Sequence, residues 1–390
     1  MKFSNLTDRV KGGAADAWDL HYLAKQAKSR GEDVIVMSVG DPDFKTPDRV
    51  VARAHQAMLD GDTHYTSILG HDELREAIAA RHRTNSGQAI DADCVITTSG
   101  AQNALFACAM CLLEPGDEAI VLQPMYVTYE ATIQAPGATL VPVVLDGAQG
   151  FRLDRERLLA AVSDRTRAIF FASPSNPTGV ALNPEELNWI AQLALENDLW
   201  VVADEVYSDF LFDGDFSHIA SNADLSDRVI TIGSLSKAYA MSGWRVGWAI
   251  APPAMIANME KLALCMLYGL PGFIQQAGAE ALLHCAPDLE AMREHYRRRR
   301  DFLYTAFSDI DGLDPLRPDA GMFMMVNVRG SGLDTPEFVR QLYHQAGVSV
   351  LDATAFGESA EGYVRISYTL ADHELEEACR RIAGFMRDLK

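Results

Sequence analysis

Residues 229–247 read VITIGSLSKAYAMSGWRVG, an apolar run followed by a lysine, an arginine and several small residues. The run Val229–Ile232 is typical of a buried strand, and Lys237 follows its carboxyl end. Ligands of open α/β sheets bind beyond the carboxyl ends of the strands. Lys237 is therefore a candidate Schiff-base nucleophile if burial and neighbouring cations lower its pKa, and Arg245 offers a planar fork suited to a phosphate. The alternative is a surface lysine beside a strand.

Apolar strands alternate with amphipathic helices on both sides of this segment. Mostly continuous apolar strands separated by helices predict an α/β fold with a mainly parallel sheet covered on both faces. The expected strands span residues 34–39, 94–98, 118–122, 139–144, 168–172, 199–203, 229–232 and 245–250. The expected helices span residues 48–59, 72–83, 101–113, 183–196 and 253–262.

The pattern changes after about residue 285, where a long charged helix is expected over residues 289–307. The elements that follow predict a smaller α+β domain. Residues 1–40 are too few to fold alone, so we expect them to pack against it. The expected strands lie near 321–328, 348–351 and 363–367, and the expected helices at 335–346 and 372–389. The predicted domains are 41–284 for the larger, and 1–40 with 285–390 for the smaller.

The charge balance of the chain disfavours one class of partner. Its 390 residues carry 34 basic and 54 acidic side chains, a net charge of −20. Such a surface repels a phosphate backbone, so no nucleic-acid partner is expected. Arg297–Arg300 form an isolated basic run, which we expect to be a solvated helix face. The composition, 48% hydrophobic and 23% charged, is that of a globular protein.

Neither a membrane span nor a metal site is expected. No apolar stretch approaches the ~18 residues that a span needs, and residues 1–13 lack the apolar core of a signal peptide. Most of the six cysteines lie in apolar runs, which indicates buried thiols in a reducing, cytoplasmic compartment. Cys108 and Cys111 have CxxC spacing, but no second Cys/His pair accompanies them, so we expect helix packing there.

Two motifs form turns after expected strands. TSGAQN at 98–103 opens a helix, and a helix N-terminus offers backbone N–H groups to an anion. SPSNPTG at 173–179 makes a rigid turn that positions the amide of Asn176. Taken singly, these motifs are also compatible with an ordinary capped turn and a Pro-rich loop.

Two further motifs place charged side chains in apolar surroundings. VADEVY at 202–207 ends a buried strand, where Asp204 needs a cationic partner. YVRISY at 363–368 places Arg365 inside an apolar strand, so this arginine must be paired or functional. A helix cap for Asp204, core packing for Tyr207 and an edge strand for Arg365 are the alternatives.

Together, and in this order across almost the whole chain, these motifs and the SxSK and GxRxG elements of 234–247 resemble the class I and II aminotransferases of fold type I. Those enzymes use pyridoxal 5′-phosphate. The resemblance implies a large domain with a mainly parallel seven-stranded sheet and a smaller α+β domain. It also implies a ping-pong transfer of the amino group from an L-amino acid to a 2-oxo acid.

The resemblance assigns a role to each motif residue. Lys237 would hold the cofactor as a Schiff base and act as the general base. The cofactor-binding residues implied are Gly100, Ala101, Gln102 and Arg245 at the phosphate, Tyr126 and Asp204 at the ring, Asn176 and Tyr207 at the 3′-oxygen, and also Ser234 and Ser236. The substrate-binding residues implied are Gly40, Asn176, Arg365 and Trp18. Tyr65 would reach the cofactor phosphate of a neighbouring subunit, so a homodimer with shared active sites is expected.

The choice of substrate depends on weaker signals. Residues 15–22, ADAWDLHY, and 262–269, LALCMLYG, resemble the corresponding stretches of arginine–pyruvate transaminases. Asp16 or Asp19 could pair with a cationic side chain and Trp18 could stack on one, whereas the alternative is a helix packed on the smaller domain. No second arginine for a distal carboxylate is identifiable, so we expect arginine or another amino acid as donor and pyruvate as acceptor.

Other functions remain open at this point. A β-lyase acting on C–S bonds, or a decarboxylase, of the same fold would keep the same cofactor residues. A non-catalytic regulatory module that binds the cofactor is a further alternative, although the region before Gly40 is too short for a DNA-binding domain. A nicotinamide dehydrogenase is excluded because no GxGxxG follows a strand.

Overall fold

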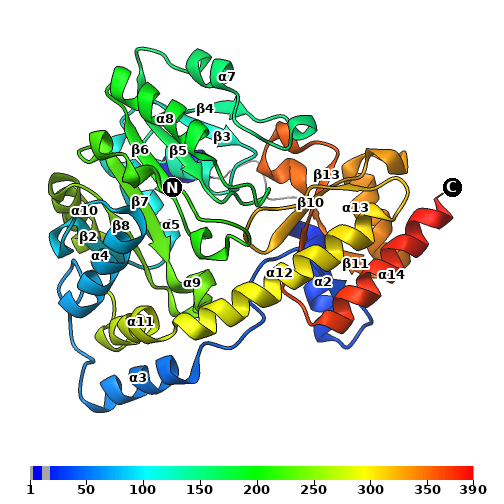
Figure 1. Cartoon of the computed structure of the whole chain (residues 1–390), viewed down its shortest axis with the longest axis horizontal. Helices are drawn as coiled ribbons and strands as arrows, with labels where there is room; N and C mark the ends of the chain where they lie inside the picture. Colours follow the sequence, from blue (N-terminus) through cyan, green and yellow to red (C-terminus); the bar gives the residue numbers. More distant parts are fainter. Residues whose placement is uncertain (1–2, 11–17, 390) are drawn as a thin grey trace.

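A seven-stranded sheet forms the larger lobe of the molecule (Figure 1). The computed structural model describes residues 3–10 and 18–389. Within the sheet, β8 runs antiparallel to both of its neighbours, and the remaining pairs are parallel. This confirms the expected mainly parallel sheet. In spatial order the strands are β2 (Val95–Thr98), β8 (Gly247–Ile250), β7 (Val229–Ser234), β6 (Trp200–Asp204), β5 (Thr166–Ala172), β3 (Glu118–Gln123) and β4 (Thr139–Val144).

Helices cover both faces of this sheet. On one face, α5 (Ala101–Leu112) and α10 (Pro253–Met266) bury Leu105, Cys108 and Met255 against the strands. On the other face, α8 (Pro184–Glu196) buries Leu187 and Ile190. Burial on both faces explains why these strands read as continuous apolar runs. The other helices of this lobe are α3 (Asp48–Leu59), α4 (Asp72–Ser86), α6 (Tyr129–Gln134), α7 (Arg155–Ala160), α9 (Leu235–Ala238) and α11 (Gly272–His284).

The smaller lobe is built on an antiparallel sheet in the order β12 (Leu351–Asp352), β13 (Tyr363–Ser367), β10 (Phe323–Asn327) and β9 (Asp314–Pro315). The prediction of a single strand over residues 348–351 is wrong, because these residues belong to two strands. Residues Val348–Ser349 form β11, which pairs in parallel with β1 (Ile35–Val36), whereas β12 pairs with β13. Through this pairing, Ile35–Val36 of the N-terminal segment joins the C-terminal part of the chain. Helices α2 (Asp19–Ser29), α13 (Thr335–Ala346) and α14 (Asp372–Asp388) complete this lobe, and α1 (Leu6–Arg9) precedes it in the chain.

The long helix α12 (Ala286–Ser308) runs past both lobes (Figure 1). The expectation of a solvated basic face on it is wrong for two of its four consecutive arginines. Arg299 is 9% exposed and pairs with Asp43 and Asp372, and Arg300 is 0% exposed and pairs with Asp213 and Asp301. The helical period turns these two arginines inward beside Tyr296 and Leu303, where acidic side chains compensate their charge.

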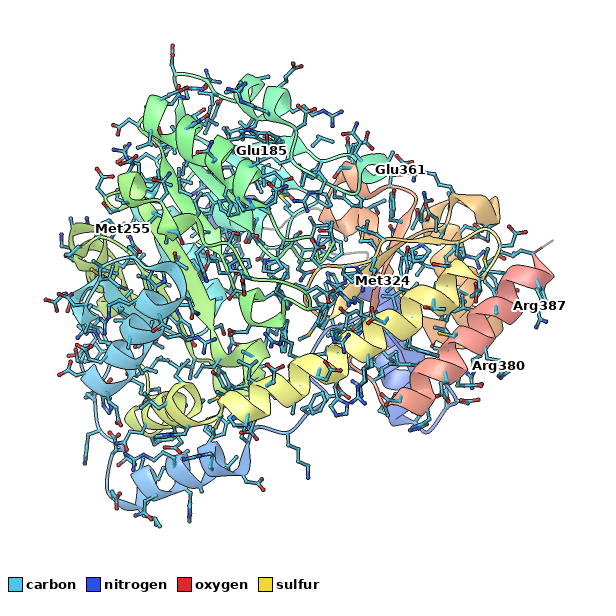
Figure 2. All side chains as sticks on the ribbon, in the orientation of Figure 1. Glu185, Met255, Met324, Glu361, Arg380 and Arg387 are labelled. Atoms are coloured by element: carbon cyan, nitrogen blue, oxygen red, sulfur yellow. The ribbon has the colours of Figure 1, made fainter. Side chains whose placement is uncertain are left out.

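Charged side chains extend from the surface, whereas apolar side chains and half of the cysteines are buried. Figure 2 shows Arg380 and Arg387 extending outward from α14, while Met324 lies inside the smaller lobe, where it is fully buried. All six cysteines are free thiols; three are buried, among them Cys108 on α5, and Cys265 is exposed.

Within residues 3–10 and 18–389, no group of three metal-ligating side chains is found. None of the described helices has the length and apolar character that crossing a membrane requires.

Candidate active site

A cavity of about 490 Å³ lies at the carboxyl ends of the large-sheet strands and extends to Arg365 of the smaller lobe. It brings together side chains from segments that are far apart in the sequence. This position agrees with the general location of ligands in open α/β sheets. The predicted site residues that line it are Trp18, Gly40, Ala101, Gln102, Tyr126, Asn176, Asp204, Tyr207, Ser234, Ser236, Lys237, Arg245 and Arg365.

Three basic side chains face the cavity without a carboxylate partner. Lys237, Arg245 and Arg365 all line it, and in the described part of the chain none of them forms an ion pair. Arg365 is 3% exposed, and its Nε is buried with no hydrogen-bond partner. Arg365 is buried and Lys237 is partly buried, whereas Arg245 is exposed. A buried cation without a partner is costly, so the site is suited to anionic groups.

Lys237 is delivered by the short helix α9, which begins directly after β7. Ser234 caps this helix, because its hydroxyl accepts a hydrogen bond from the backbone N–H of Ser236 at 3.0 Å. Lys237 Nζ donates to the carbonyl of Gly40 at 2.8 Å. Burial lowers the pKa of Lys237 to about 8, and the nearby arginines act in the same direction while Asp41 opposes them. Part of the lysine population is therefore an unprotonated nucleophile near neutral pH.

Gly100 and Gly247 allow the guanidinium of Arg245 to lie against the start of α5. Arg245 adopts a left-handed backbone, with φ of 59°, and donates to the carbonyls of Ser242 and Ser99 at 2.8 and 3.2 Å. A Cβ at Gly100 would collide with this guanidinium, and a Cβ at Gly247 would collide with the backbone of Gly100. The result is a cradle that combines a helix N-terminus with an arginine, which suits a phosphate.

Asp204 ends β6 and is 9% exposed. Its carboxylate accepts hydrogen bonds from the hydroxyl of Tyr129 at 2.9 Å and from the backbone N–H of Val206 at 3.2 Å. Burial raises the pKa of Asp204 to about 6, although these two hydrogen bonds lower it. No cation pairs with Asp204 within the described residues, so a cationic group of a ligand could fill that role.

Arg365 lies on β13 between two phenylalanine rings. Its guanidinium carbon is 4.2 Å from the ring centroid of Phe323 and 4.8 Å from that of Phe356. It donates to the amide oxygen of Asn176 and to the carbonyl of Ser38, both at 2.8 Å. Burial lowers its pKa to about 10, which leaves the side chain charged near neutral pH. A fork held in this way can bind a carboxylate in a fixed orientation.

Some predicted residues lie elsewhere. Tyr65 does not line the cavity: it is 88% exposed and packs on Tyr268, with ring centroids 5.0 Å apart. Asp19 is exposed at the start of α2, and Asp16 lies outside the described residues.

Sequence reasoning missed several contributors to the site. Phe323 covers Gly40 so closely that a Cβ there would collide with its ring, and Tyr129 supports Asp204. Tyr129 lies three residues after the predicted Tyr126, but nothing in the sequence marks Asp204 as its partner. The lining residues that the sequence does not mark as site residues are Val39, Asp41, Leu105, Ala172, Val206, Ser242, Gly243 and Phe323.

Comparisons with known proteins agree with this geometry. The family model described as aminotransferase class I and II matches residues 32–382. The chain is 50% identical to the arginine–pyruvate transaminase AruH of Pseudomonas aeruginosa, over 98% of both chains. It is 34% identical to an aspartate aminotransferase of Musicola paradisiaca, over 97% of this chain and 96% of that protein.

Solved structures share the whole fold. An aspartate aminotransferase from Thermus thermophilus with maleate superposes with a TM-score of 0.93 at 32% identity, covering 98% of this chain and 99% of the other. An aspartate aminotransferase from Thermotoga maritima does so with a TM-score of 0.93 at 30% identity, covering 99% of this chain and all of the other. Together with the family match, these findings confirm the resemblance inferred from the motifs and the fold type. The chain belongs to the class I and II aminotransferases, enzymes that transfer the amino group of an amino acid to a 2-oxo acid.

Proposed function

We propose that this aminotransferase uses pyridoxal 5′-phosphate and transfers the amino group of L-arginine to pyruvate. The observation that carries the proposal is the convergence of three unpaired cations, Lys237, Arg245 and Arg365, on one cavity that also holds a buried carboxylate. A phosphate, an aldehyde and a substrate carboxylate would use the three cations, and a protonated ring nitrogen would use Asp204.

The cavity fits this cofactor on its own chemistry. The cradle at Gly100 and Arg245 suits a phosphate, and the backbone of Ala101 and Gln102 with the hydroxyls of Ser234 and Ser236 would complete its binding. Tyr126 would cover one face of the ring. The phenol of Tyr207, whose pKa burial raises, stays protonated and would donate to the 3′-oxygen, as would the amide nitrogen of Asn176.

The chain's own residues account for the movement of protons and the placement of the substrate. When bound, the cofactor would supply an aldehyde for the amino group and a ring that accepts electrons. Lys237 Nζ, with its pKa of about 8, would take the proton from the substrate Cα. Arg365 and the backbone of Gly40 would hold the substrate α-carboxylate beside this amine. Phe323 and Phe356 exclude water from the guanidinium of Arg365.

Three features support L-arginine as the amino donor. The relative with 50% identity over the whole chain is an arginine–pyruvate transaminase. Among the described lining residues, Lys237, Arg245 and Arg365 are the only cations, so none remains for a second substrate carboxylate. Trp18 and the exposed carboxylate of Asp41 also line the cavity, and both attract a cationic side chain.

Measuring donor and acceptor preference with the purified holoenzyme tests the proposal. We expect L-arginine with pyruvate to give the highest kcat/KM among pairings of L-arginine and L-aspartate with pyruvate and 2-oxoglutarate. Lys237→Ala should abolish turnover and the visible absorbance that borohydride removes, whereas Lys261→Ala, an exposed lysine on α10, should change neither. A preference for L-aspartate would reject the proposed donor, and near wild-type turnover by Lys237→Ala would reject the assignment of the site.

We also propose a homodimer with shared active sites. Tyr65 is 88% exposed, beside Tyr268 at 51%, and Leu59 on α3 is 68% exposed. Two large aromatic side chains that pack together and remain exposed, as Tyr65 and Tyr268 do, are typical of a protein interface. In such a dimer Tyr65 would reach the phosphate site of the neighbouring subunit.

The domain division is proposed as residues 41–284 for the large domain, and 1–40 with 285–390 for the small one. All strands of the seven-stranded sheet fall within residues 95–250, and those of the four-stranded sheet fall within residues 314–367. Pairing of β1 with β11 supports the inclusion of the N-terminal residues in the small domain.

A further inference from the structure

Helix α2 brings two aromatic side chains to the edge of the active-site cavity. Trp18 occupies the position directly before this helix and lines the cavity, and His21 lies one turn further along without lining it. The two rings meet edge to face, with centroids 5.8 Å apart and planes at 90°. His21 therefore supports Trp18 from outside the cavity.

His21 is itself anchored to the carboxylate-binding part of the site. Its Nδ1 lies 2.8 Å from the hydroxyl oxygen of Ser38, and Ser349 donates to the same oxygen at 3.3 Å. Ser38 is fully buried, and its carbonyl accepts the hydrogen bond from Arg365 Nη2. One buried serine thus fixes both the imidazole that supports Trp18 and the guanidinium of Arg365.

The electrostatics along this wall suit a cationic side chain. Burial, with the charges of Lys25 and Arg365, lowers the pKa of His21, so its imidazole is neutral near neutral pH and does not repel a cation. The lining carboxylate of Asp41 forms no ion pair within the described residues. A planar cation over the face of a tryptophan is attracted by the ring quadrupole.

We propose that Trp18 is the specificity-determining wall of the substrate side-chain site, on which the guanidinium of L-arginine stacks, and that His21 is the positioning residue that holds its ring. The hydrogen bond to Ser38 keeps His21 in place and couples the side-chain wall to Arg365. This inference rests on the proposed use of L-arginine as donor.

Steady-state kinetics with two donors of similar length, L-arginine and the neutral L-norleucine, test this arrangement with pyruvate as acceptor. Trp18→Leu should raise the KM for L-arginine about tenfold, because it removes the aromatic face on which the guanidinium stacks. We expect kcat to change little and the KM for L-norleucine to change much less. Trp18→Phe, which keeps an aromatic face, should lie between Trp18→Leu and the wild type.

The positioning role of His21 has its own readout. His21→Ala should raise the KM for L-arginine several-fold with little effect on kcat, because the ring of Trp18 loses its support. His21→Asn, whose amide can reach Ser38, should restore most of the loss. Leu23→Ala, an exposed residue of the same helix that does not line the cavity, is the matched control and should behave as the wild type.

The outcomes separate this inference from the proposed function. A wild-type enzyme that does not use L-arginine rejects the proposed donor, and the inference with it. If the wild type uses L-arginine but Trp18→Leu affects both donors equally, the inference alone is wrong. It is also wrong if Asp41→Asn removes the preference for L-arginine while Trp18→Leu retains it, or if His21→Ala lowers kcat as much as kcat/KM.

Discussion

Asp204 and Glu205 are consecutive carboxylates at the end of β6, but their side chains meet different chemistry. Asp204 lines the active-site cavity, whereas Glu205, the first residue after β6, lines a separate pocket together with His218. Tyr129 donates to Asp204, whereas Glu205 lies 2.7 Å from His218 Nδ1, with both side chains of that pair below 10% exposure. The charge of Glu205 adds to burial in raising the pKa of Asp204. The pairing of Glu205 with His218 therefore bears on the pKa of Asp204, because it changes the net charge beside that carboxyl group.

The pair of Glu205 and His218 predicts how stability depends on pH. Burial alone would lower the pKa of His218, but the hydrogen bond and charge of Glu205 raise it above its ordinary value of 6.5. Since the folded-state pKa is the higher one, the stabilisation is fully present below pH 6.5 and is lost as the pH rises through the raised value. His218→Gln should therefore lower the free energy of unfolding more at low pH than at high pH.

Urea unfolding of the wild type and of His218→Gln over a pH series measures this difference. The neighbouring imidazole of His82, 6.5 Å from that of His218, has its pKa lowered by burial and remains in both proteins, so its contribution cancels to first order. Glu205→Gln combined with His218→Gln removes both charges and should show a weaker pH dependence than His218→Gln alone. A difference that stays constant across the series would show that His218 is not charged in the folded protein.

At the scale of elements, the sequence predicts best where the hydrophobic period is long and local. The helices expected over 48–59 and 335–346 and the strands over 139–144 and 363–367 have those bounds in the structure. Each of them has a repeated apolar face or a clear capping or turn residue at its ends. Such local signals do not depend on which distant element packs against them.

Elements and contacts that depend on distant partners could not be predicted in this way. Residues 348–351, VSVL, resemble a single strand, yet they divide between two sheets because Val348 pairs with Ile35 and Leu351 pairs with Arg365. The same limit applies to the site. Strand ends revealed Lys237 and Asp204, whereas Phe323 contacts Gly40 only because β10 packs against a segment that is distant in the sequence.

On helix α12, the burial of Arg300 predicts that its substitution destabilises the protein, although the charged sequence of the helix suggested an exposed side chain. Arg300 is fully buried, lies 4.6 Å from the ring centroid of Phe212 and donates to Asp213, but its Nη2 has no partner. Arg300→Ala should lower the free energy of unfolding by about 3 kcal/mol, because it removes packing and charge compensation together. Arg300→Met keeps most of the volume and removes the unpartnered nitrogen, so its loss should be about 1–2 kcal/mol smaller.

Thermal or urea unfolding of these two variants provides the measurement. Arg298→Ala is the matched control: it changes an exposed arginine of the same helix and should alter stability by no more than about 0.5 kcal/mol. If Arg300→Met destabilised the protein as much as Arg300→Ala, the ion pairs rather than the packing would dominate at this position.

For the whole molecule, the arrangement of the two lobes determines where the site can be completed. The cavity is lined by Trp18, Gly40, Phe323 and Arg365 as well as by residues of the large sheet, and Arg299 on α12 ties the segment with Asp43 to Asp372. Tyr65 lies outside this cavity and faces solvent. If its role at the phosphate is as proposed, a second copy of the chain must supply it.

Mixing two inactive variants tests that requirement. Lys237→Ala lacks the nucleophile, and Tyr65→Ala lacks the residue that would serve the partner's site. In a mixed dimer both defects fall on one site and the other is intact, so random mixing should restore about a quarter of the wild-type activity. Activity measured after co-refolding equal amounts of the two variants gives this value.

The matched control combines Lys237→Ala with Arg365→Ala, because these two residues line the same cavity of one subunit. In their mixed dimer each site retains one defect, so no activity should return. Recovery with Tyr65→Ala and none with Arg365→Ala can arise only if Tyr65 acts across the interface while Arg365 acts within its own chain. Failure of both mixtures, with sedimentation showing dimers of the wild type, would assign Tyr65 a role in its own subunit or none. A monomeric wild type that turns over at full rate would reject the shared site altogether.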